Sequence, residues 1–343
     1  MQQCRVRGVR SVELAVTNLE EAGRFYESVW GLRPVDARAG VRLYRGTAAY
    51  HHIVGLHRGP RPGLVRIVFD VADRDGVDAL HHAISTAGGP VTAPARLAAD
   101  GGGYGFGCRD PDGRNLAFVC ACADHPDIKD MSDVPRQIAH VNLNALNFDA
   151  SHRFFTETLG FRQIDENAPL WFLHCDTSEH SSIVLAKTGL ATLNHIAFEM
   201  PDFDSVMRGM GRMKENGYPI EWGPGRHGPG NNVFAYFCGP DEVPIEYTAE
   251  VLQIDDDYVP RGSEHWKFPP GRSDQWGITQ PRSARYYRVQ RLFGFTDDGY
   301  RLEATGRGDE VAQPAPPSST SAAAIGMLSS GVSRTRRPSA TRT

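Results

Sequence analysis

The chain has no long apolar run, and this absence limits the kind of protein it can be. Its 343 residues contain no stretch of about 18 consecutive apolar residues, which a membrane-spanning helix would need. The charged N-terminal residues are not followed by an apolar segment, so we expect no secretory signal. With 40% hydrophobic and 23% charged residues, the composition indicates a globular protein, which we expect in the cytoplasm.

Clustered cysteines and a strong net charge are also lacking. The six cysteines are scattered, and the one close pair, Cys120 and Cys122, has neither a redox CxxC nor a zinc-site spacing. We therefore expect reduced thiols. A formal net charge of −4 gives no electrostatic reason to expect nucleic acid or an anionic membrane as a partner. The Gly-rich stretch 101–107 leads into a strand pattern, not a helix, which excludes a dinucleotide loop.

An internal duplication is the most informative feature that is present. When the chain is slid over itself so that Asn18 falls on Asn147, the same shift aligns Gly31-Leu32-Arg33 with Gly160-Phe161-Arg162. Further along, this duplication shift aligns Arg66 with His195 and Pro111-Asp112 with Pro240-Asp241 without a gap. Residues 5–122 and 136–250 are therefore predicted to be two copies of one module.

Each module is predicted to divide again into two β-α-β-β-β units. Phe-Asp follows at the same interval after both His140 and His195, which indicates a weaker repeat of about 55 residues. Helices are predicted over 149–159 and 204–216, and strands over 170–174, 182–186 and 232–237. The predicted fold is α+β: tandem βαβββ units form two modules, and each module forms a half-barrel sheet around a cavity.

The remaining segments have distinct compositions. Residues 123–135 are polar and acidic with two prolines, which is typical of a connector. Residues 251–300 are rich in aromatics and prolines, and we expect an ordered extension packed on the second module. Residues 305–343 are rich in Ala, Ser, Thr, Pro and Arg without periodicity, which predicts a disordered tail.

Three side chains of the second module can form a metal site. His140 and His195 occupy equivalent strand positions in its two units, and Glu246 stands in its last apolar strand. A single strand histidine is more often an ordinary core residue, but two at equivalent positions plus a carboxylate match the facial triad of non-heme Fe(II). The first module provides a comparison, because it has Ser11, Arg66 and Ala117 at these positions. The His and Glu residues are therefore not required by the fold of the module.

Two further segments supply candidate acid–base groups. His180 precedes a predicted strand, where a solvated loop histidine is the simpler interpretation of that residue alone. The Gly/Pro-rich loop 223–232 carries Arg226 and His227 and is a plausible substrate lid. It leads into a strand with Tyr236, which on its own could be a core tyrosine.

With these residues in place, the chain resembles the vicinal oxygen chelate superfamily. It is most similar to the two-module type I extradiol catechol dioxygenases, whose C-terminal module holds Fe(II) with two His and one Glu. The family also has a His ahead of the second ligand His, at a spacing that falls on His180. It has a further His and a Tyr ahead of the ligand Glu, and their spacings fall on His227 and Tyr236. The biphenyl-diol branch has Asn-Asp where Pro229-Gly230 stand, which weakens the case for a bicyclic substrate.

The resemblance implies an Fe(II)-dependent ring-cleaving dioxygenase that acts on a catechol with O2 in aromatic catabolism. His140, His195 and Glu246 would hold the metal, for which Mn(II) is also compatible. His180, His227 and Tyr236 would be catalytic: His180 would accept a substrate proton, and the other two would hold the substrate oxygen. The family also makes a homo-oligomer the expected assembly.

Two other functions remain open. A non-oxidative metal-dependent lyase or isomerase of the same superfamily would use a related site, although such enzymes usually take ligands from two modules. A metal-free binding protein of the antibiotic-sequestering kind would need neither the triad nor His180 and Tyr236.

Overall fold

The structure, a computed structural model, describes residues 4–98 and 101–305. The first module contains β1 (Val6–Val16), α1 (Leu19–Arg24), β2 (Arg33–Arg38), β3 (Val41–Arg45), β4 (Val54–Arg58), β5 (Gly63–Val71), α2 (Arg74–Ala87), β6 (Ala95–Arg96), β7 (Tyr104–Arg109) and β8 (Asn115–Cys120). The second contains β9 (Ile138–Ala145), α3 (Phe148–Arg153), β10 (Arg162–Asn167), β11 (Leu170–His174), β12 (Ile183–Lys187), β13 (Leu193–Glu199), α4 (Phe203–Glu215), β14 (Trp222–Arg226), β15 (Val233–Cys238) and β16 (Pro244–Ala249). The extension carries α5 (Ala284–Leu292).

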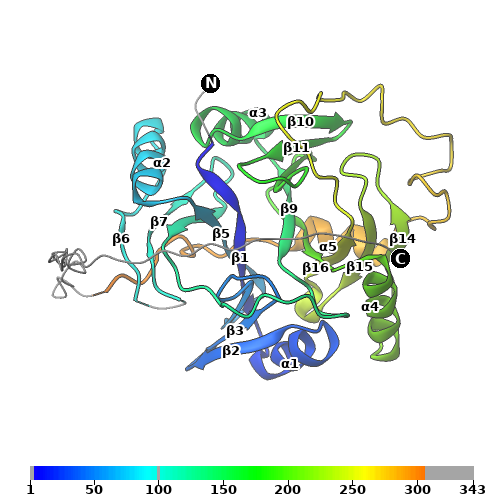
Figure 1. The fold of residues 1–343 in the computed structure, drawn as a ribbon, viewed down its shortest axis with the longest axis horizontal. Coiled ribbons are helices and arrows are strands. Elements are labelled where there is room, and N and C mark those ends of the chain that lie inside the picture. The colour runs from blue at the N-terminus through cyan, green and yellow to red at the C-terminus, as the bar shows by residue number, and fades with distance from the viewer. Residues whose placement is uncertain (1–3, 99–100, 306–343) are drawn as a thin grey trace, which may run out of the picture. The chain divides into compact units, whose positions relative to one another are not determined.

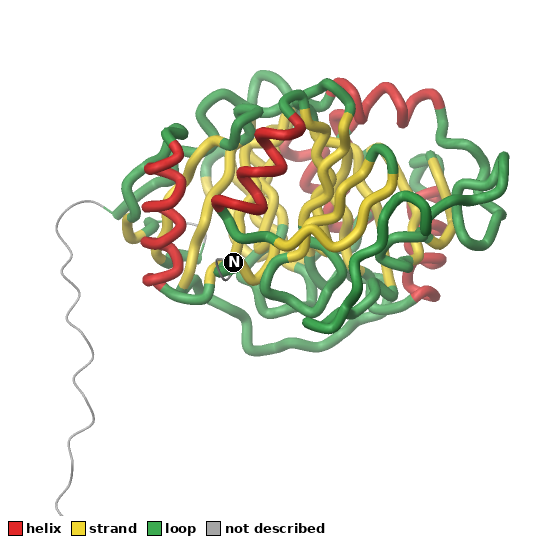
Figure 2. Tube along the Cα trace, turned by 90° about the horizontal axis from the view of Figure 1, so that it is seen from above, coloured by secondary structure: helices red, strands yellow, loops and turns green. Residues whose placement is uncertain are grey.

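The predicted duplication and α+β class are confirmed by the two sheets. Each has eight strands, in the orders β2-β3-β4-β1-β5-β8-β7-β6 and β10-β11-β12-β9-β13-β16-β15-β14. The two orders are the same, because each strand of the second sheet occupies the place of its counterpart in the first, from β2 and β10 to β6 and β14. Corresponding elements keep the duplication shift seen in the sequence: β8 begins at Asn115 and β16 at Pro244. Figure 1 shows the two sets of strands, and Figure 2 shows the helices outside them.

The first helix of the second module differs from the prediction, and its counterpart in the first module has the same form. α1 and α3 each continue into a π-helical turn, over Phe25–Val29 and Phe154–Thr158. In these turns Trp30 N–H donates to the Phe25 carbonyl and Leu159 N–H to the Phe154 carbonyl. The predicted helix over 149–159 is thus a short α-helix followed by a wider turn. Hydrophobic periodicity cannot distinguish these two forms of helix.

An aromatic contact joins the modules. Trp30, which follows the first π turn, stacks on Tyr247 of β16 with ring centroids 3.7 Å apart. The Tyr247 hydroxyl donates to the Trp30 carbonyl at 2.7 Å, and Arg212 of α4 donates to the Val29 carbonyl. Trp30 and Tyr247 are both completely buried. The core is therefore continuous between the modules.

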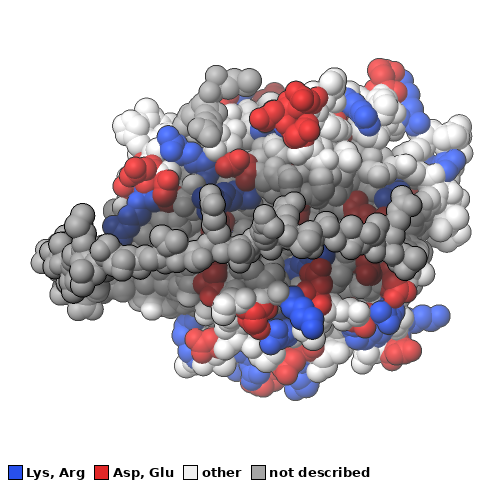
Figure 3. Space-filling view, viewed as in Figure 1, with Lys and Arg blue, Asp and Glu red and all other residues white. Residues whose placement is uncertain are grey.

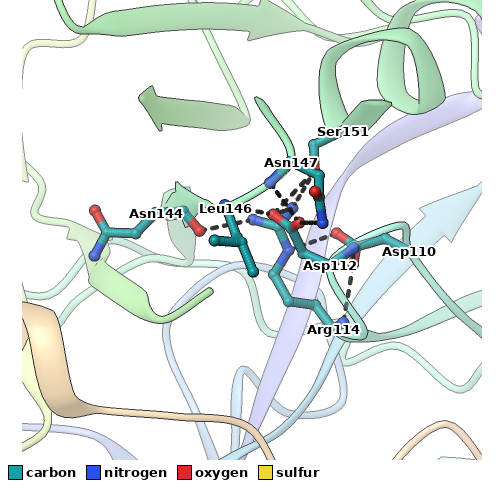
Figure 4. Close-up of polar contacts among 7 residues, drawn as sticks. All are labelled: Asp110, Asp112, Arg114, Asn144, Leu146, Asn147 and Ser151. Atoms are coloured by element: carbon teal, nitrogen blue, oxygen red, sulfur yellow. Dashed lines mark hydrogen bonds and ion pairs between the residues drawn. The ribbon is translucent and has the colours of Figure 1, made fainter. Parts of the chain in front are cut away.

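Polar contacts cross the module boundary in both directions. Asp112, in the turn between β7 and β8, accepts hydrogen bonds from the backbone N–H groups of Leu146 and Asn147 just before α3, at 3.0 and 2.9 Å (Figure 4). At the equivalent place in the second module, Asp241 accepts from the N–H of Thr17 just before α1, at 2.8 Å. Each module thus binds the backbone that leads into the first helix of the other.

Arg114 adds a charge to one of these two contacts. Its side chain is fully buried, pairs with Asp110 and Asp112, and donates to the Asn144 carbonyl and the Ser151 hydroxyl of the second module (Figure 4). Asn144, Ser151 and the two aspartates therefore surround a single guanidinium at the module boundary.

The extension contacts both modules. α5 packs on β13, β15 and β16 of the second module, with Tyr286 and Val289 buried against Trp222 and Phe234. After α5 the chain crosses to the first module, where Leu64 N–H donates to the Gly294 carbonyl and Ala98 N–H to the Glu303 carbonyl. The predicted tail, apart from Thr305, lies outside the described residues.

The remaining global features are simple. The six cysteines are free thiols. Within 4–98 and 101–305, no helix combines the length and apolarity that a bilayer crossing requires. On the face seen in Figure 3, Lys and Arg side chains are interspersed with Asp and Glu side chains.

Candidate metal centre and active site

The two histidines and the glutamate project from neighbouring central strands of the second sheet. Strand β13 lies between β9 and β16. Ala197 of β13 pairs with His140 on one side and with Glu246 on the other, and His195 precedes Ala197 by two residues. Because side chains two residues apart in a strand share a face, this register directs all three side chains to the same side of the sheet.

The three side chains converge at one point. His140 Nε2 lies 3.1 Å from His195 Nε2, and Glu246 Oε2 lies 3.6 Å from His140 Nε2 and 3.1 Å from His195 Nε2. One ligand atom of each residue lies within 4.8 Å of the other two. Glu246 is fully buried and His195 is 5% exposed.

The hydrogen bonds of His195 orient its ring. Its Nδ1 donates to Asn194 Oδ1 at 2.9 Å, and the same oxygen accepts from Gln290 Nε2 of α5 at 2.6 Å. The Asn194 amide nitrogen in turn donates to Asn144 Oδ1 at 3.0 Å. With the proton on Nδ1, the lone pair on Nε2 faces His140 and Glu246, which is the tautomer that a metal ligand needs.

Burial determines the charge of this cluster. It lowers the pKa of His140 to about 4 and that of His195 to about 3, so both imidazoles are neutral at pH 7. It raises the pKa of Glu246 to about 7, and Glu246 Oε2 has no hydrogen-bond partner within the described part of the chain. A buried carboxylate oxygen facing two imidazole lone pairs is a poor arrangement without a cation and a suitable one with it. The residues present therefore fit a divalent metal ion.

His180 is held by a buried carboxylate. Its Nε2 donates to Asp165 Oδ2 at 2.9 Å, and Asp165 also accepts from the Tyr258 hydroxyl at 3.0 Å and from Arg261 N–H at 2.8 Å. His180 Nδ1 is buried and has no partner among the residues described. Since Nε2 carries the proton, Nδ1 is an acceptor available to a bound molecule.

His227 and Tyr236 form a pair beside the carboxylate. His227 Nε2 lies 2.8 Å from the Tyr236 hydroxyl and 3.9 Å from Glu246 Oε1. Burial lowers the pKa of His227 well below its ordinary value and raises that of Tyr236 well above. The pair is therefore neutral, and the Tyr236 ring, stacked on Trp222 at 5.0 Å, is fixed in place.

These groups line one cavity of about 150 Å³. The predicted His140, His180, His195, His227 and Tyr236 all contribute to its wall. So do Pro229 and Gly230 of the Gly/Pro-rich loop, which places this loop at the cavity as a lid would require. The extension packs against this loop, because a side-chain carbon on Gly228 would lie 2.9 Å from the Trp266 ring.

The residues that orient these histidines were not among those predicted from the sequence. Asn194 directly precedes His195, and this position could have indicated that its amide orients the histidine ring. Asp165 stands in β10, and it reaches His180 only because β10 and the start of β12 lie on either side of β11. Gln290 and Arg282, which also line the cavity, come from the extension and have no counterpart in the repeat. No sequence signal pointed to them.

The fold and the site together define a family. The sequence profile of the Glyoxalase/Bleomycin resistance protein/Dioxygenase superfamily matches residues 8–118 and 137–247, one match for each module. The chain belongs to this superfamily, and the resemblance stated from the sequence is confirmed.

Individual relatives within the superfamily differ in activity. A solved structure of the Mn(II)-bound glyoxalase from Novosphingobium aromaticivorans is 35% identical, covers 82% of this chain and 94% of that chain, and has a TM-score of 0.76. Metapyrocatechase 2 from Cupriavidus necator is 30% identical over 154 residues, which are 43% of this chain and 46% of that protein. The chain thus spans about half the length of this curated relative.

A third comparison concerns the fold alone. A solved structure of an extradiol ring-cleaving dioxygenase from B. fuscum is 21% identical, covers 88% of this chain and 86% of that chain, and has a TM-score of 0.76. Its arrangement of elements is thus similar to that of this chain over most of both proteins.

Proposed function

We propose that the protein is an extradiol ring-cleaving dioxygenase that acts on a catechol-type aromatic diol with O2. The observation that carries this proposal is the site itself: a two-histidine, one-glutamate cluster whose histidines share one cavity of the described chain with an unpartnered His180 Nδ1 and the His227–Tyr236 pair. The match to metapyrocatechase 2 supports the same reaction class.

His140, His195 and Glu246 would hold Fe(II), with Mn(II) as the other metal that fits these ligands. When bound there, the metal would supply two-point binding of the vicinal oxygens of the substrate and electron transfer to O2. Three protein ligands leave room for a bidentate substrate and for O2. Both oxygen atoms of O2 enter the ring-opened product, so the reaction needs no further reductant.

The protein residues would handle the protons. His180 Nδ1 accepts a proton from a substrate hydroxyl, and the Asp165 carboxylate on Nε2 stabilises the imidazolium that forms. The proton returns from His180 to the substrate oxygen as the ring opens. The Tyr236 hydroxyl, held by His227, donates a hydrogen bond to a substrate oxygen. Trp222 and Phe172, which also line the cavity, exclude water from the ring.

A glyoxalase-type reaction is the second candidate, and the Mn(II)-bound relative favours it. Such an enzyme would rearrange its substrate without consuming O2. Against this candidate, the corresponding positions of the first module hold Ser11, Arg66 and Ala117, none of which is a strong metal ligand.

The test is anaerobic reconstitution of the purified chain with Fe(II), followed by oxygen-electrode and absorbance assays with catechol. We expect O2 uptake in equal amount to catechol and a yellow ring-opened product. Glu246→Ala should bind no iron and consume no O2, whereas Glu215→Ala, at an exposed position of α4, should behave as the unmodified protein.

The same preparation distinguishes the two candidates. Absence of O2 uptake with any catechol despite bound iron, together with isomerisation of a glutathione hemithioacetal by the Mn(II) form, would reject the dioxygenase in favour of the glyoxalase.

A further inference from the structure

The first module has a cavity of its own at the place that corresponds to the active site. Its volume is about 140 Å³, against about 150 Å³ for the cavity of the second module. Several wall positions of the two cavities correspond under the duplication shift, among them Ser11 and His140, Glu13 and Asn142, and Arg66 and His195. The first module has therefore kept the cavity while it lacks the metal ligands.

A guanidinium replaces the metal-ligand histidine in this cavity. Arg66 stands where the second module has His195, with Ser11 and Ala117 at the other two ligand positions. Arg66 Nη1 donates to the Arg301 carbonyl at 3.5 Å, and its buried Nε has no hydrogen-bond partner in residues 4–98 and 101–305. A cation thus lines the cavity with hydrogen-bonding capacity to spare.

Glu13, the acidic residue opposite Arg66 in the neighbouring strand, already has other hydrogen-bond partners. The backbones of Glu13 in β1 and Arg66 in β5 lie opposite each other. However, Glu13 Oε1 lies 3.0 Å from His52 Nε2, and Glu13 Oε2 lies 2.6 Å from His57 Nε2. The Ser11 hydroxyl also donates to Glu13, at 3.2 Å. Both oxygens of Glu13 are therefore engaged by partners other than Arg66.

A second arginine of the cavity wall, Arg10, has its own counter-ions. It pairs with Asp70 at 3.1 Å and with Asp124 at 2.9 Å. An arginine supplied with two carboxylates is a structural ion pair, whereas Arg66 has a backbone carbonyl alone among the residues described. Arg66 is therefore better suited than Arg10 to an incoming anion.

The rest of the cavity wall is suited to the apolar part of an organic ligand. Val68, Leu97 and Val119 contribute apolar side chains to the wall, and the extension contributes Arg301, Leu302 and Glu303. This closing segment, residues 293–305, is attached at both ends: Thr296 N–H donates to the Leu64 carbonyl and Thr305 N–H to the Arg96 carbonyl. The cavity is thus small, partly apolar and covered.

From these features we infer that the cavity of the first module binds a small organic carboxylate, with Arg66 as the residue that holds it. The planar guanidinium presents parallel N–H donors that match the two oxygens of a carboxylate. Burying a guanidinium nitrogen without a hydrogen-bond partner costs free energy of folding. An apolar side chain at position 66 would cost less. A bound carboxylate supplies the missing partner.

Benzoate is the probe, because it is planar, carries one carboxylate and lacks the vicinal hydroxyls that ring cleavage needs. Calorimetric titration of the full chain should show one saturable site. Arg66→Gln should weaken binding roughly 10- to 100-fold. Arg66→Lys should bind with intermediate affinity, since an ammonium keeps the charge without the paired donors. Circular dichroism of both variants checks that they fold.

Two controls separate this site from the surface and from the metal centre. Arg58→Gln, at an exposed position of the same module, should bind benzoate as the unmodified protein does. His140→Ala, which removes a candidate metal ligand, should also leave benzoate binding unchanged. A crystal grown with benzoate should place its carboxylate against Arg66.

The inference is overturned by any of four results: no saturable benzoate binding, equal binding by folded Arg66→Gln, loss of binding in His140→Ala, or displacement of benzoate by inorganic phosphate at equal affinity. The last result would mean that the site selects charge alone and not an organic carboxylate.

Discussion

Two histidines of the second module are each oriented by one hydrogen bond from a ring nitrogen, but the acceptors differ in charge. His195 donates to a neutral amide oxygen, that of Asn194, whereas His180 donates to the carboxylate of Asp165. An amide fixes the tautomer without favouring a positive charge on the ring, and a carboxylate does both. The partner therefore separates a ring suited to binding a metal from a ring suited to accepting a proton.

His180 gives the first prediction. We expect His180→Ala to lower kcat by roughly 10²- to 10⁴-fold, because the site loses its proton acceptor, while iron content stays the same. Steady-state kinetics and metal analysis of the purified variant measure both quantities. His152→Ala, in α3, is the matched control. An unchanged kcat, or a parallel loss of iron, would contradict a role in proton transfer.

Glu13 of the first module gives a pH prediction. Burial opposes its ionisation, but the hydrogen bonds from His52 and His57 outweigh burial and hold the pKa of Glu13 well below its ordinary value. A carboxyl group whose pKa is lower in the folded chain adds stability that is present above its unfolded pKa of about 4.3 and is lost as the pH falls through the folded value.

We therefore expect Glu13→Gln to lower the free energy of unfolding by about 2 kcal/mol at pH 7, with a difference that shrinks below about pH 4.3. Urea titrations of both proteins across this range measure it. Glu27→Gln, at an exposed position, should show no such difference. A difference for Glu13→Gln that stays constant with pH would refute the assignment.

Among the elements, the sequence predicted those that the duplication repeats. Strands over 170–174 and 232–237 and the helix over 204–216 follow from turn signals in the second module, and the duplication offers a second copy of each in the first. The same comparison aligned Pro111-Asp112 with Pro240-Asp241, but the sequence could not show that each aspartate binds the backbone just before a helix of the opposite module. Contacts between modules depend on their relative placement, which periodicity does not report.

The contacts of Asp112 and Asp241 across the module boundary should differ in their contribution to stability. Asp112 also pairs with the fully buried Arg114, whereas Val243 stands at the position equivalent to Arg114. We expect Asp112→Ala to cost about 3 kcal/mol, because a buried guanidinium loses one of its counter-ions. Asp241→Ala should cost about 1 kcal/mol, the value of a hydrogen bond that is lost without leaving a buried charge unpaired. Chemical denaturation measures both, and equal losses would count against the role given to Arg114.

At the scale of the molecule, the extension was the part that the sequence described least well. Its aromatic content predicted order and contact with the second module, but not that its end crosses the first module or that Gln290 supports Asn194 beside His195. Residues 251–305 occur once in the chain, so no second copy was available to interpret them.

These connections predict that the two modules unfold together. Amide hydrogen exchange of β5 and β13, the central strands of the two sheets, should give the same opening free energy, because the Trp30–Tyr247 stack and the hydrogen bonds of Asp112 and Asp241 across the boundary are lost together. Separation of the two values by more than about 1 kcal/mol would show that the modules are independent folding units.

The paired aspartate contacts across the module boundary have an evolutionary meaning as well. Contacts in which residue i of one half meets residue j of the other, and j meets i, are the signature of an isologous interface between two identical subunits. Asp112 with Leu146 and Asp241 with Thr17 keep that pattern within a single chain. The protein can thus be viewed as a homodimer whose subunits were joined end to end. After the two were joined, one module could specialise in catalysis. The other could carry Ser11, Arg66 and Ala117 at the ligand positions, because the contacts that hold the modules together lie outside both cavities.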